Sequence, residues 1–171
     1  RSDDHMQTYL LHVNSLYFDG TRSMLGSFGP AQRMLLAPDG ADRIDGTIDH
    51  IGNKYYLTVK RDGLNMELWE NSALSVNGWK RVRDKALYGF EAPCVISVGT
   101  KFRMFADGVP DVEPYGVRMW ESASIDGKWV EKPVKFVDEN GVDMGIVRHG
   151  TVLPVSYSKD RAAWNAVNGL L

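Results

Sequence analysis

One pattern occurs twice in the sequence, as Glu67-Leu68-Trp69-Glu70-Asn71-Ser72-Ala73 and as Arg118-Met119-Trp120-Glu121-Ser122-Ala123. An aromatic segment precedes each copy, Lys54-Tyr55-Tyr56-Leu57 in the first case and Lys101-Phe102-Arg103-Met104-Phe105 in the second. A further tryptophan follows each copy, so that Trp69 and Trp120 are 51 positions apart and Trp79 and Trp129 are 50 apart. A period of about 50 residues, built from short strands and turns, predicts the blades of a β-propeller.

The segments around this repeat predict strands rather than helices. They are short and rich in β-branched, aromatic or alternating residues: Ile44–Ile51, Lys54–Lys60, Met66–Glu70, Cys94–Val98, Phe102–Phe105, Gly116–Glu121 and Gly150–Ser156. Turn pairs such as Asn77-Gly78 separate them, and only Ser158–Val167 has a helical pattern. We therefore expect residues 1–171 to form a single all-β module, with Met6 as the natural start and the residues before it derived from expression.

Composition excludes several classes of function. The 171 residues contain 20 Lys and Arg against 22 Asp and Glu, a formal net charge of -2, which favours neither nucleic acid nor an anionic membrane as a partner. No apolar stretch approaches the roughly 20 residues that span a bilayer. Cys94 is the single cysteine, so an internal disulfide is impossible, and its strand context predicts a small buried residue. A chain of this kind is compatible with the bacterial cytoplasm and with secretion.

Each predicted blade opens with an ionisable residue just before a short apolar strand. The three openings are Ile44-Asp45-Gly46-Thr47-Ile48, Phe90-Glu91-Ala92-Pro93-Cys94-Val95 and Arg148-His149-Gly150-Thr151-Val152. Because the first strand of every propeller blade lines the central channel, we expect Asp45, Glu91 and His149 to converge on one axial site. Two carboxyl groups that face a common cavity are what glycoside hydrolysis requires.

These openings, in this order and spacing, resemble the later blades of glycoside hydrolase family 43, from about residue 40 to the C-terminus. That family contains five-bladed, inverting arabinofuranosidases, xylosidases and arabinanases. The resemblance implies that Glu91 is the general acid, with a pKa raised by burial and a nearby acid, and that Asp45 orients it and modulates its pKa. It also implies that His149 helps to hold calcium, although calcium prefers oxygen ligands.

Other residues near the openings are candidates for sugar binding. Arg148 is a candidate contact for a sugar hydroxyl, and Phe90 and Tyr88 are candidates for stacking on a sugar ring. The four repeat tryptophans are expected to pack between blades instead. Simpler explanations stay open: Asp45 and Asp107 as turn residues, Glu91 as a solvated strand end, His149 as a core histidine and Arg148 as a surface residue.

The chain departs from the family pattern in two ways. Ala92 stands where the family usually has a glycine, and no aspartate between Met6 and Pro38 occupies a recognisable general-base motif, since Asp19 is typical of a hairpin turn. Inversion needs such a base, with the two carboxyls roughly 6.5–9.5 Å apart. We therefore expect the chain alone to hydrolyse poorly or not at all.

Propeller closure raises a related question. A period near 50 gives a little over three four-stranded blades, whereas closed propellers have about four to eight. An open arc would expose strand edges, so the chain is either a fragment or, if complete, a homo-oligomer. The leading hypothesis is a family 43-like module that acts on an oligo- or polysaccharide and retains the acid but lacks the base. The alternatives are a non-catalytic carbohydrate-binding or self-assembling partial propeller, and an unrelated all-β interaction domain.

Overall fold

A computed structural model describes residues 32–34, 39–61, 63, 65–109, 115–138, 140–149 and 152, together with the backbone of residues 9–10, 16–18 and 23–25. The predicted helix Ser158–Val167 lies outside the described residues, as does Asp19, and of the predicted strand Gly150–Ser156 only Val152 is described. A search of the described residues for a helix long and apolar enough to cross a membrane finds none.

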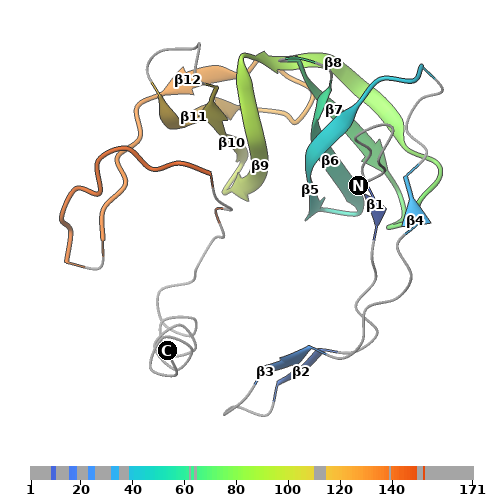
Figure 1. The fold of residues 1–171 in the computed structure, drawn as a ribbon, viewed down its shortest axis with the longest axis horizontal. Coiled ribbons are helices and arrows are strands. Elements are labelled where there is room, and N and C mark those ends of the chain that lie inside the picture. The colour runs from blue at the N-terminus through green and yellow to red at the C-terminus, as the bar shows by residue number, and fades with distance from the viewer. Residues whose placement is uncertain are drawn as a thin grey trace.

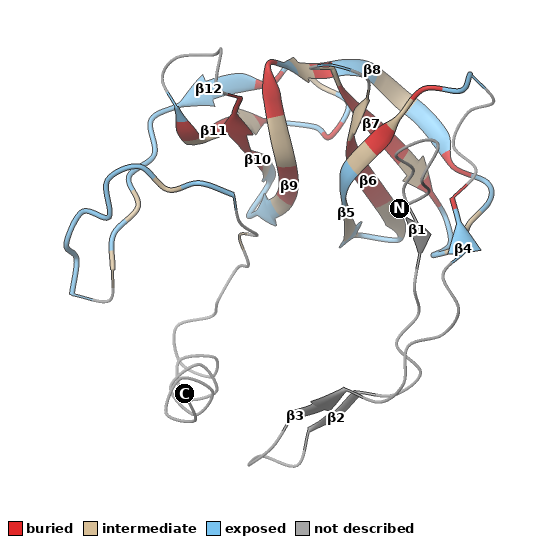
Figure 2. Ribbon diagram, in the orientation of Figure 1, coloured by how far each residue is buried: buried red, intermediate tan, exposed pale blue. Residues whose placement is uncertain are grey.

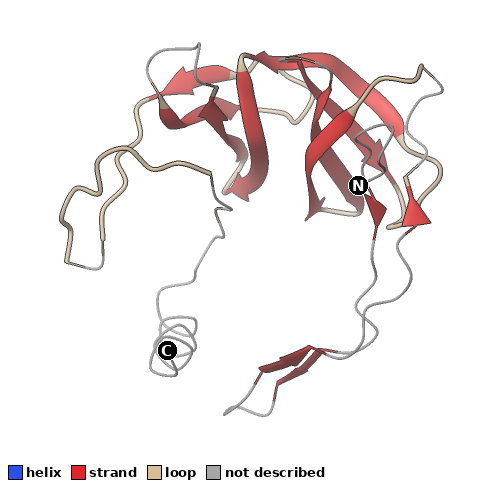
Figure 3. Ribbon diagram, in the orientation of Figure 1, coloured by secondary structure: helices blue, strands red, loops and turns tan. Residues whose placement is uncertain are grey.

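Two four-stranded antiparallel sheets dominate the fold (Figure 1, Figure 3). The first runs in chain order through β5 (Arg43–Ile51), β6 (Lys54–Arg61), β7 (Asn65–Asn71) and β8 (Lys80–Tyr88). The second follows in the same way through β9 (Phe90–Val98), β10 (Lys101–Gly108), β11 (Gly116–Ser122) and β12 (Val130–Lys132). Two short pairs, β1 (Tyr9–Leu10) with β4 (Gln32–Arg33) and β2 (Leu16–Phe18) with β3 (Ser23–Leu25), complete the strands.

The first strands of the two sheets, β5 and β9, pack against each other (Figure 1). Each sheet is a meander with the strand order of a propeller blade, so the fold class is confirmed as an all-β, partial β-propeller. The described sheets form an arc and do not close into a ring. Of the roughly three predicted blades, two are present in full among the described residues.

The core lies in the central strands and between the two sheets (Figure 2). Met66 and Leu68 of the first sheet belong to the same buried cluster as Met104 and Trp120 of the second. The four repeat tryptophans are all buried, at 3% to 8% exposure. Trp120 and Trp129 belong to the cluster that both sheets share, as predicted, whereas Trp69 and Trp79 pack in a second cluster within the first sheet and against Met34. The repeat thus recurs because each blade buries the same aromatic residues in its core.

The sequence patterns missed β8 as a strand. Its residues Lys80 to Lys85 include five charged side chains and lack the alternation that marks a half-buried strand. The strand lies at the outer edge of its sheet, where charged residues discourage pairing with another chain. Local pattern therefore failed here because the edge position, rather than burial, selects these residues.

The first strand of each sheet, β5 or β9, carries a bulge that contains a residue with a left-handed backbone. The register slips between Ile44 and Thr47 in β5, where Asp45 has φ 56°, and opposite Ala106 in β9, where Ala92 has φ 47°. The two bulge residues are 47 positions apart in the sequence. The structural equivalent of Asp45 is therefore Ala92 rather than Glu91, which corrects the predicted equivalence of the two openings by one residue.

Candidate functional site

The Glu91 side chain lies at the start of β9, one residue before the bulge, and is half-buried. Its two carboxylate oxygens contact two different side chains, Lys60 and His149. Oε2 accepts a hydrogen bond from Lys60 Nζ at 2.9 Å, and Oε1 lies 2.9 Å from His149 Nε2. Lys60 belongs to β6 of the first sheet, so Glu91 connects the two sheets with the segment that follows them.

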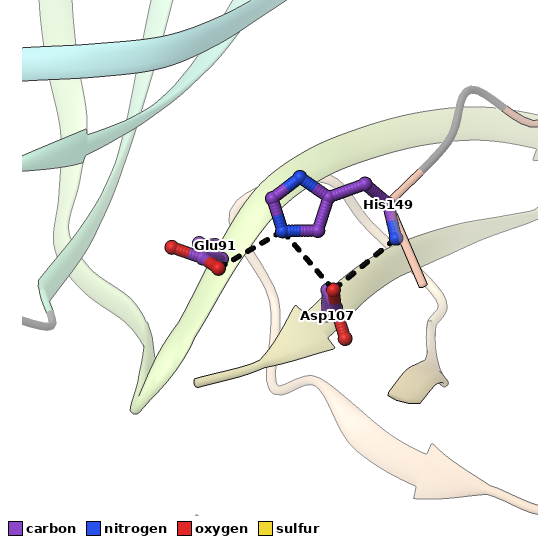
Figure 4. Close-up of side chains that lie close together, drawn as sticks. All are labelled: Glu91, Asp107 and His149. Carbon is purple, nitrogen blue, oxygen red and sulfur yellow. Dashed lines mark hydrogen bonds and ion pairs between the residues drawn. The ribbon is translucent and has the colours of Figure 1, made fainter. Parts of the chain in front are cut away.

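The Asp107 side chain is fully buried at the end of β10, directly across from Glu91 in the sheet. Arg148 Nε donates to both of its oxygens, at 2.9 and 2.7 Å. The same carboxylate lies 3.1 Å from His149 Nε2 and accepts a hydrogen bond from the His149 backbone N–H at 3.2 Å. Figure 4 shows the ring of His149 held between Glu91 and Asp107. Asp107 therefore organises this part of the site rather than only forming a turn.

A close backbone approach places residues 147–149 at the second sheet. The Val117 N–H at the start of β11 donates to the Val147 carbonyl at 2.8 Å. Gly116 has φ 101°, and a Cβ there would lie 3.0 Å from the Ile146 side chain and 3.2 Å from the Val147 carbonyl. His149 has φ 37°, so its backbone is also left-handed. Glycine at position 116 permits this docking and thereby carries Arg148 and His149 to Asp107.

The pKa of Glu91 contradicts the expected raised value. Burial by itself would raise this pKa, but hydrogen bonds from Lys60 and His149 outweigh it, and the pKa lies below its ordinary value of 4.5. The expectation of a raised pKa is therefore wrong for this arrangement. It failed because Lys60 and His149, and not a second acid alone, surround the carboxyl group and form hydrogen bonds with it.

The side chain of Lys60 contacts both Asp45 and Glu91. The Lys60 ammonium lies 3.9 Å from Asp45 Oδ2 and 2.9 Å from Glu91 Oε2, so these two carboxylate oxygens are less than about 7 Å apart. The structure thus brings Asp45, Glu91 and His149 together, as the openings predicted. A positive charge stands between the two acids, which the openings did not predict.

The other predicted site residues differ in exposure. Tyr88, at the end of β8, is 65% exposed, so its ring is accessible to a ligand. Phe90 is buried, with its ring 4.6 Å from that of Trp120 in an edge-on arrangement and the Arg118 guanidinium over its face. Phe90 therefore packs in the core, and a stacking role remains open to Tyr88 alone of the two.

Sequence reasoning missed Lys60 as a site residue and left Asp107 as a turn. A signal for both exists in the repeat, because the two residues are 47 positions apart, the same separation as the bulge residues Asp45 and Ala92. Lys60 pairs with Ile44 across β5 and β6, and Asp107 pairs with Glu91 across β9 and β10. The same position in two successive blades thus carries a cation in one and an anion in the other.

Three potential metal ligands gather in the site. One ligand atom each from Glu91, Asp107 and His149 lies within 4.8 Å of the others. Calcium takes about six to eight oxygen ligands, and this set offers two carboxylate oxygens beside a ring nitrogen. Lys60 and Arg148 already pair with the two carboxylates. The described residues therefore do not by themselves form a calcium site, and calcium binding stays a prediction.

The fold and the site together define an all-β, partial propeller with a charged cluster at the start of its inner strands. Neither a protein-family model nor a curated protein matches the sequence. The solved structure of a thermostable family-43 glycoside hydrolase is similar over 59% of this chain, with 20% sequence identity and a TM-score of 0.46. The chain spans 39% of that structure's chain, so a whole enzyme's activity and substrates are proposals here.

Proposed function

We propose that this chain is a carbohydrate-active module related to glycoside hydrolase family 43, of the type that acts on α-L-arabinofuranosides or β-D-xylosides. The observation that carries the proposal is the convergence of Asp45, Glu91 and His149, which head three separate segments. The Lys60 ammonium contacts both carboxylates, and His149 contacts Glu91. The motifs around these residues are those that resemble the family. The left-handed residues at Asp45, Ala92 and His149 add support, since strained backbone concentrates at functional sites.

In this proposal Glu91 faces the glycosidic oxygen, and Asp45 and Lys60 set its charge. Arg148 and Tyr88 are the proposed sugar contacts, because both side chains are exposed. Arg148 Nη2 lies 4.0 Å from Glu91 Oε1, and Tyr88 precedes Glu91 by three residues in the sequence. A general acid must hold a proton when the bond breaks, whereas the contacts of Glu91 with Lys60 and His149 favour its ionised form. Proton donation therefore requires that a bound sugar first separate Glu91 from Lys60. We assign the general base to no residue of this chain.

Hydrolysis of nitrophenyl α-L-arabinofuranoside and nitrophenyl β-D-xyloside tests the proposal. In Glu91→Gln the shape of the side chain is kept and the acid is removed, so turnover should fall by roughly 10²- to 10⁴-fold. The matched control is Glu121→Gln, because Glu121 also pairs with a lysine but lies on β11 in an exposed pair with Lys101. Turnover that survives in Glu91→Gln, or that falls equally in both variants, would refute the assignment of Glu91.

A second candidate function is carbohydrate binding without hydrolysis. The lowered pKa of Glu91 favours it, since an ionised carboxylate accepts hydrogen bonds from sugar hydroxyls but donates no proton. This function predicts saturable binding of the same glycosides with no release of nitrophenol. Calorimetric titration beside the hydrolysis assay distinguishes the two functions.

Calcium and self-association complete the proposal. Calorimetric titration with calcium should show saturable heat that is lost in His149→Gln, if the family resemblance extends to this ion.

Self-association is supported by an exposed apolar group after β12, in which Val142, Met144 and Ile146 are 58% to 70% exposed. Light scattering at high concentration should then give a mass above that of one chain, and a monodisperse monomer would refute self-association.

A further inference from the structure

The imidazole of His149 is held through one nitrogen only. Its Nε2 lies 2.9 Å from Glu91 Oε1 and 3.1 Å from Asp107 Oδ2, and both contacts converge on this atom in Figure 4. Ionised carboxylates only accept hydrogen bonds. The proton of the neutral ring must therefore reside on Nε2, where one N–H is shared between two acceptors.

Asp107 is placed so that it cannot release the ring by rotating away. Its side chain is fully buried, and both of its oxygens are bound by Arg148 Nε, at 2.9 and 2.7 Å. One of them also accepts the backbone N–H of His149 at 3.2 Å. The carboxylate thus fixes the backbone and the ring of His149 at once, and Arg148 fixes the carboxylate.

The other ring nitrogen, Nδ1, faces away from both carboxylates (Figure 4). The His149 side chain is 55% exposed, and within the part of the chain that the structure describes Nδ1 has no hydrogen-bond partner. With the proton on Nε2, Nδ1 carries a bare lone pair, which accepts a hydrogen bond from a hydroxyl group.

We propose that Asp107 is a positioning residue which, together with Glu91, holds His149 in its Nε2–H form and so presents Nδ1 as an acceptor for a hydroxyl group of a carbohydrate ligand. The identity of the ligand rests on the proposed function, whereas the tautomer and its cause rest on the contacts of His149 alone. A carbohydrate hydroxyl would donate to Nδ1 while Glu91 remains in contact with Nε2 on the other side of the ring.

The wild-type protein tests the tautomer without any ligand. Nitrogen-15 NMR of the histidine rings, recorded about one unit above the ordinary histidine pKa of about 6.5, distinguishes protonated from bare ring nitrogens. We expect a protonated Nε2 and a bare Nδ1 for His149. An Nδ1–H tautomer or an imidazolium at this pH would overturn the proposal. His50, which is exposed and stacked on Tyr55, serves as a reference in the same spectrum.

The Asp107→Asn variant tests the positioning role. Its amide can donate as well as accept, so we expect an Nδ1–H population of His149 to appear while His50 is unchanged. Asp49→Asn is the matched control and should leave His149 unaffected, because Asp49 is a partly buried aspartate that accepts the Val95 N–H instead. A folded Asp107→Asn protein with a wild-type His149 spectrum would overturn the role of Asp107. If this variant does not fold, the wild-type spectrum still decides the tautomer.

A titration with nitrophenyl α-L-arabinofuranoside tests the acceptor role. Binding should shift the Nδ1 resonance of His149 and not that of His50, and Asp107→Asn should weaken binding roughly tenfold, the effect of about one hydrogen bond. Binding that leaves Nδ1 unshifted would overturn the acceptor role. Absence of any sugar binding would refute the proposed function. The tautomer of His149 is measured without ligand, so that result is independent of whether the protein binds a sugar.

Discussion

The Lys60 ammonium lies 2.9 Å from Glu91 Oε2, although the two residues belong to different sheets. This contact makes the charge of Glu91 depend on the packing of β5 and β6 against β9. A side chain contributed by one blade thus sets the protonation of a side chain in the next.

Removing this cation should change the titration of Glu91. In Lys60→Met the hydrogen bond and charge that lower the pKa of Glu91 are lost while burial, which raises it, remains, so the pKa should rise. Carbon-13 NMR of the glutamate carboxyl groups measures this. Lys101→Met, which removes the exposed partner of Glu121, is the control. An unchanged Glu91 titration in Lys60→Met would contradict this explanation of the lowered pKa.

Replacing Ala92 by glycine should stabilise the fold. Ala92 has φ 47°, a left-handed conformation that costs a residue with a Cβ about 1–2 kcal/mol and glycine very little. The greater flexibility of glycine when unfolded offsets about 0.5–1 kcal/mol, which leaves a gain of about 0.5–1 kcal/mol. Urea unfolding measures the change. Ala106→Gly, at the buried position opposite the bulge, should instead lower the stability by about 1 kcal/mol.

Asp49 should make stability depend on pH. Burial raises its pKa from 3.8 to about 6, and it accepts the Val95 N–H at 3.2 Å from the neighbouring sheet. The folded state therefore binds a proton more readily than the unfolded state, and stability from this group is lost as the pH rises through about 4 to 6. Asp49→Asn keeps an acceptor and cannot ionise. The stability of Asp49→Asn relative to that of the wild type should rise by about 1–2 kcal/mol between about pH 4 and 7. This value is smaller than the full pKa shift would give, because Asp49 is partly exposed to solvent. A pH-independent difference would contradict the raised pKa.

Glu67 should be among the most sensitive positions of the first sheet. Its fully buried carboxylate accepts hydrogen bonds from Arg43 Nε at 2.8 Å, Arg81 at 2.9 Å and the indole of Trp69 at 2.9 Å. Glu67→Gln removes the buried negative charge between Arg43 and Arg81, although Arg43 keeps its pair with Asp39. The change should cost about 2–3 kcal/mol in guanidinium unfolding. Glu70→Gln, three residues further along β7 and in a partly exposed pair with Lys54, is the control and should change stability far less. Equal losses of unfolding free energy in the two variants would show that the buried network around Glu67 stabilises the fold no more than the partly exposed pair of Glu70.

The sequence alone predicted much of the architecture. The tryptophan spacing predicted blades, and alternating or aromatic segments located strands such as Lys54–Arg61 and Gly116–Ser122 to within a residue or two. These predictions succeeded because burial of one face imposes a local, repeating pattern. The strand β8 was missed because its charged residues suit an exposed sheet edge rather than a half-buried strand. That edge is defined by the strands with which β8 pairs and cannot be read from its own sequence pattern.

The sequence by itself identified Asp45, Glu91 and His149 as ionisable residues that each precede an apolar run. Only the tertiary structure decided what surrounds them. Lys60 and Asp107 reach the site from second strands, and their contacts with Glu91 and His149 span 31 and 42 residues. No local pattern encodes such a distance, because pairing across strands and packing between sheets bring these charges together. Their balance then sets the charge of Glu91 and the proton position on His149.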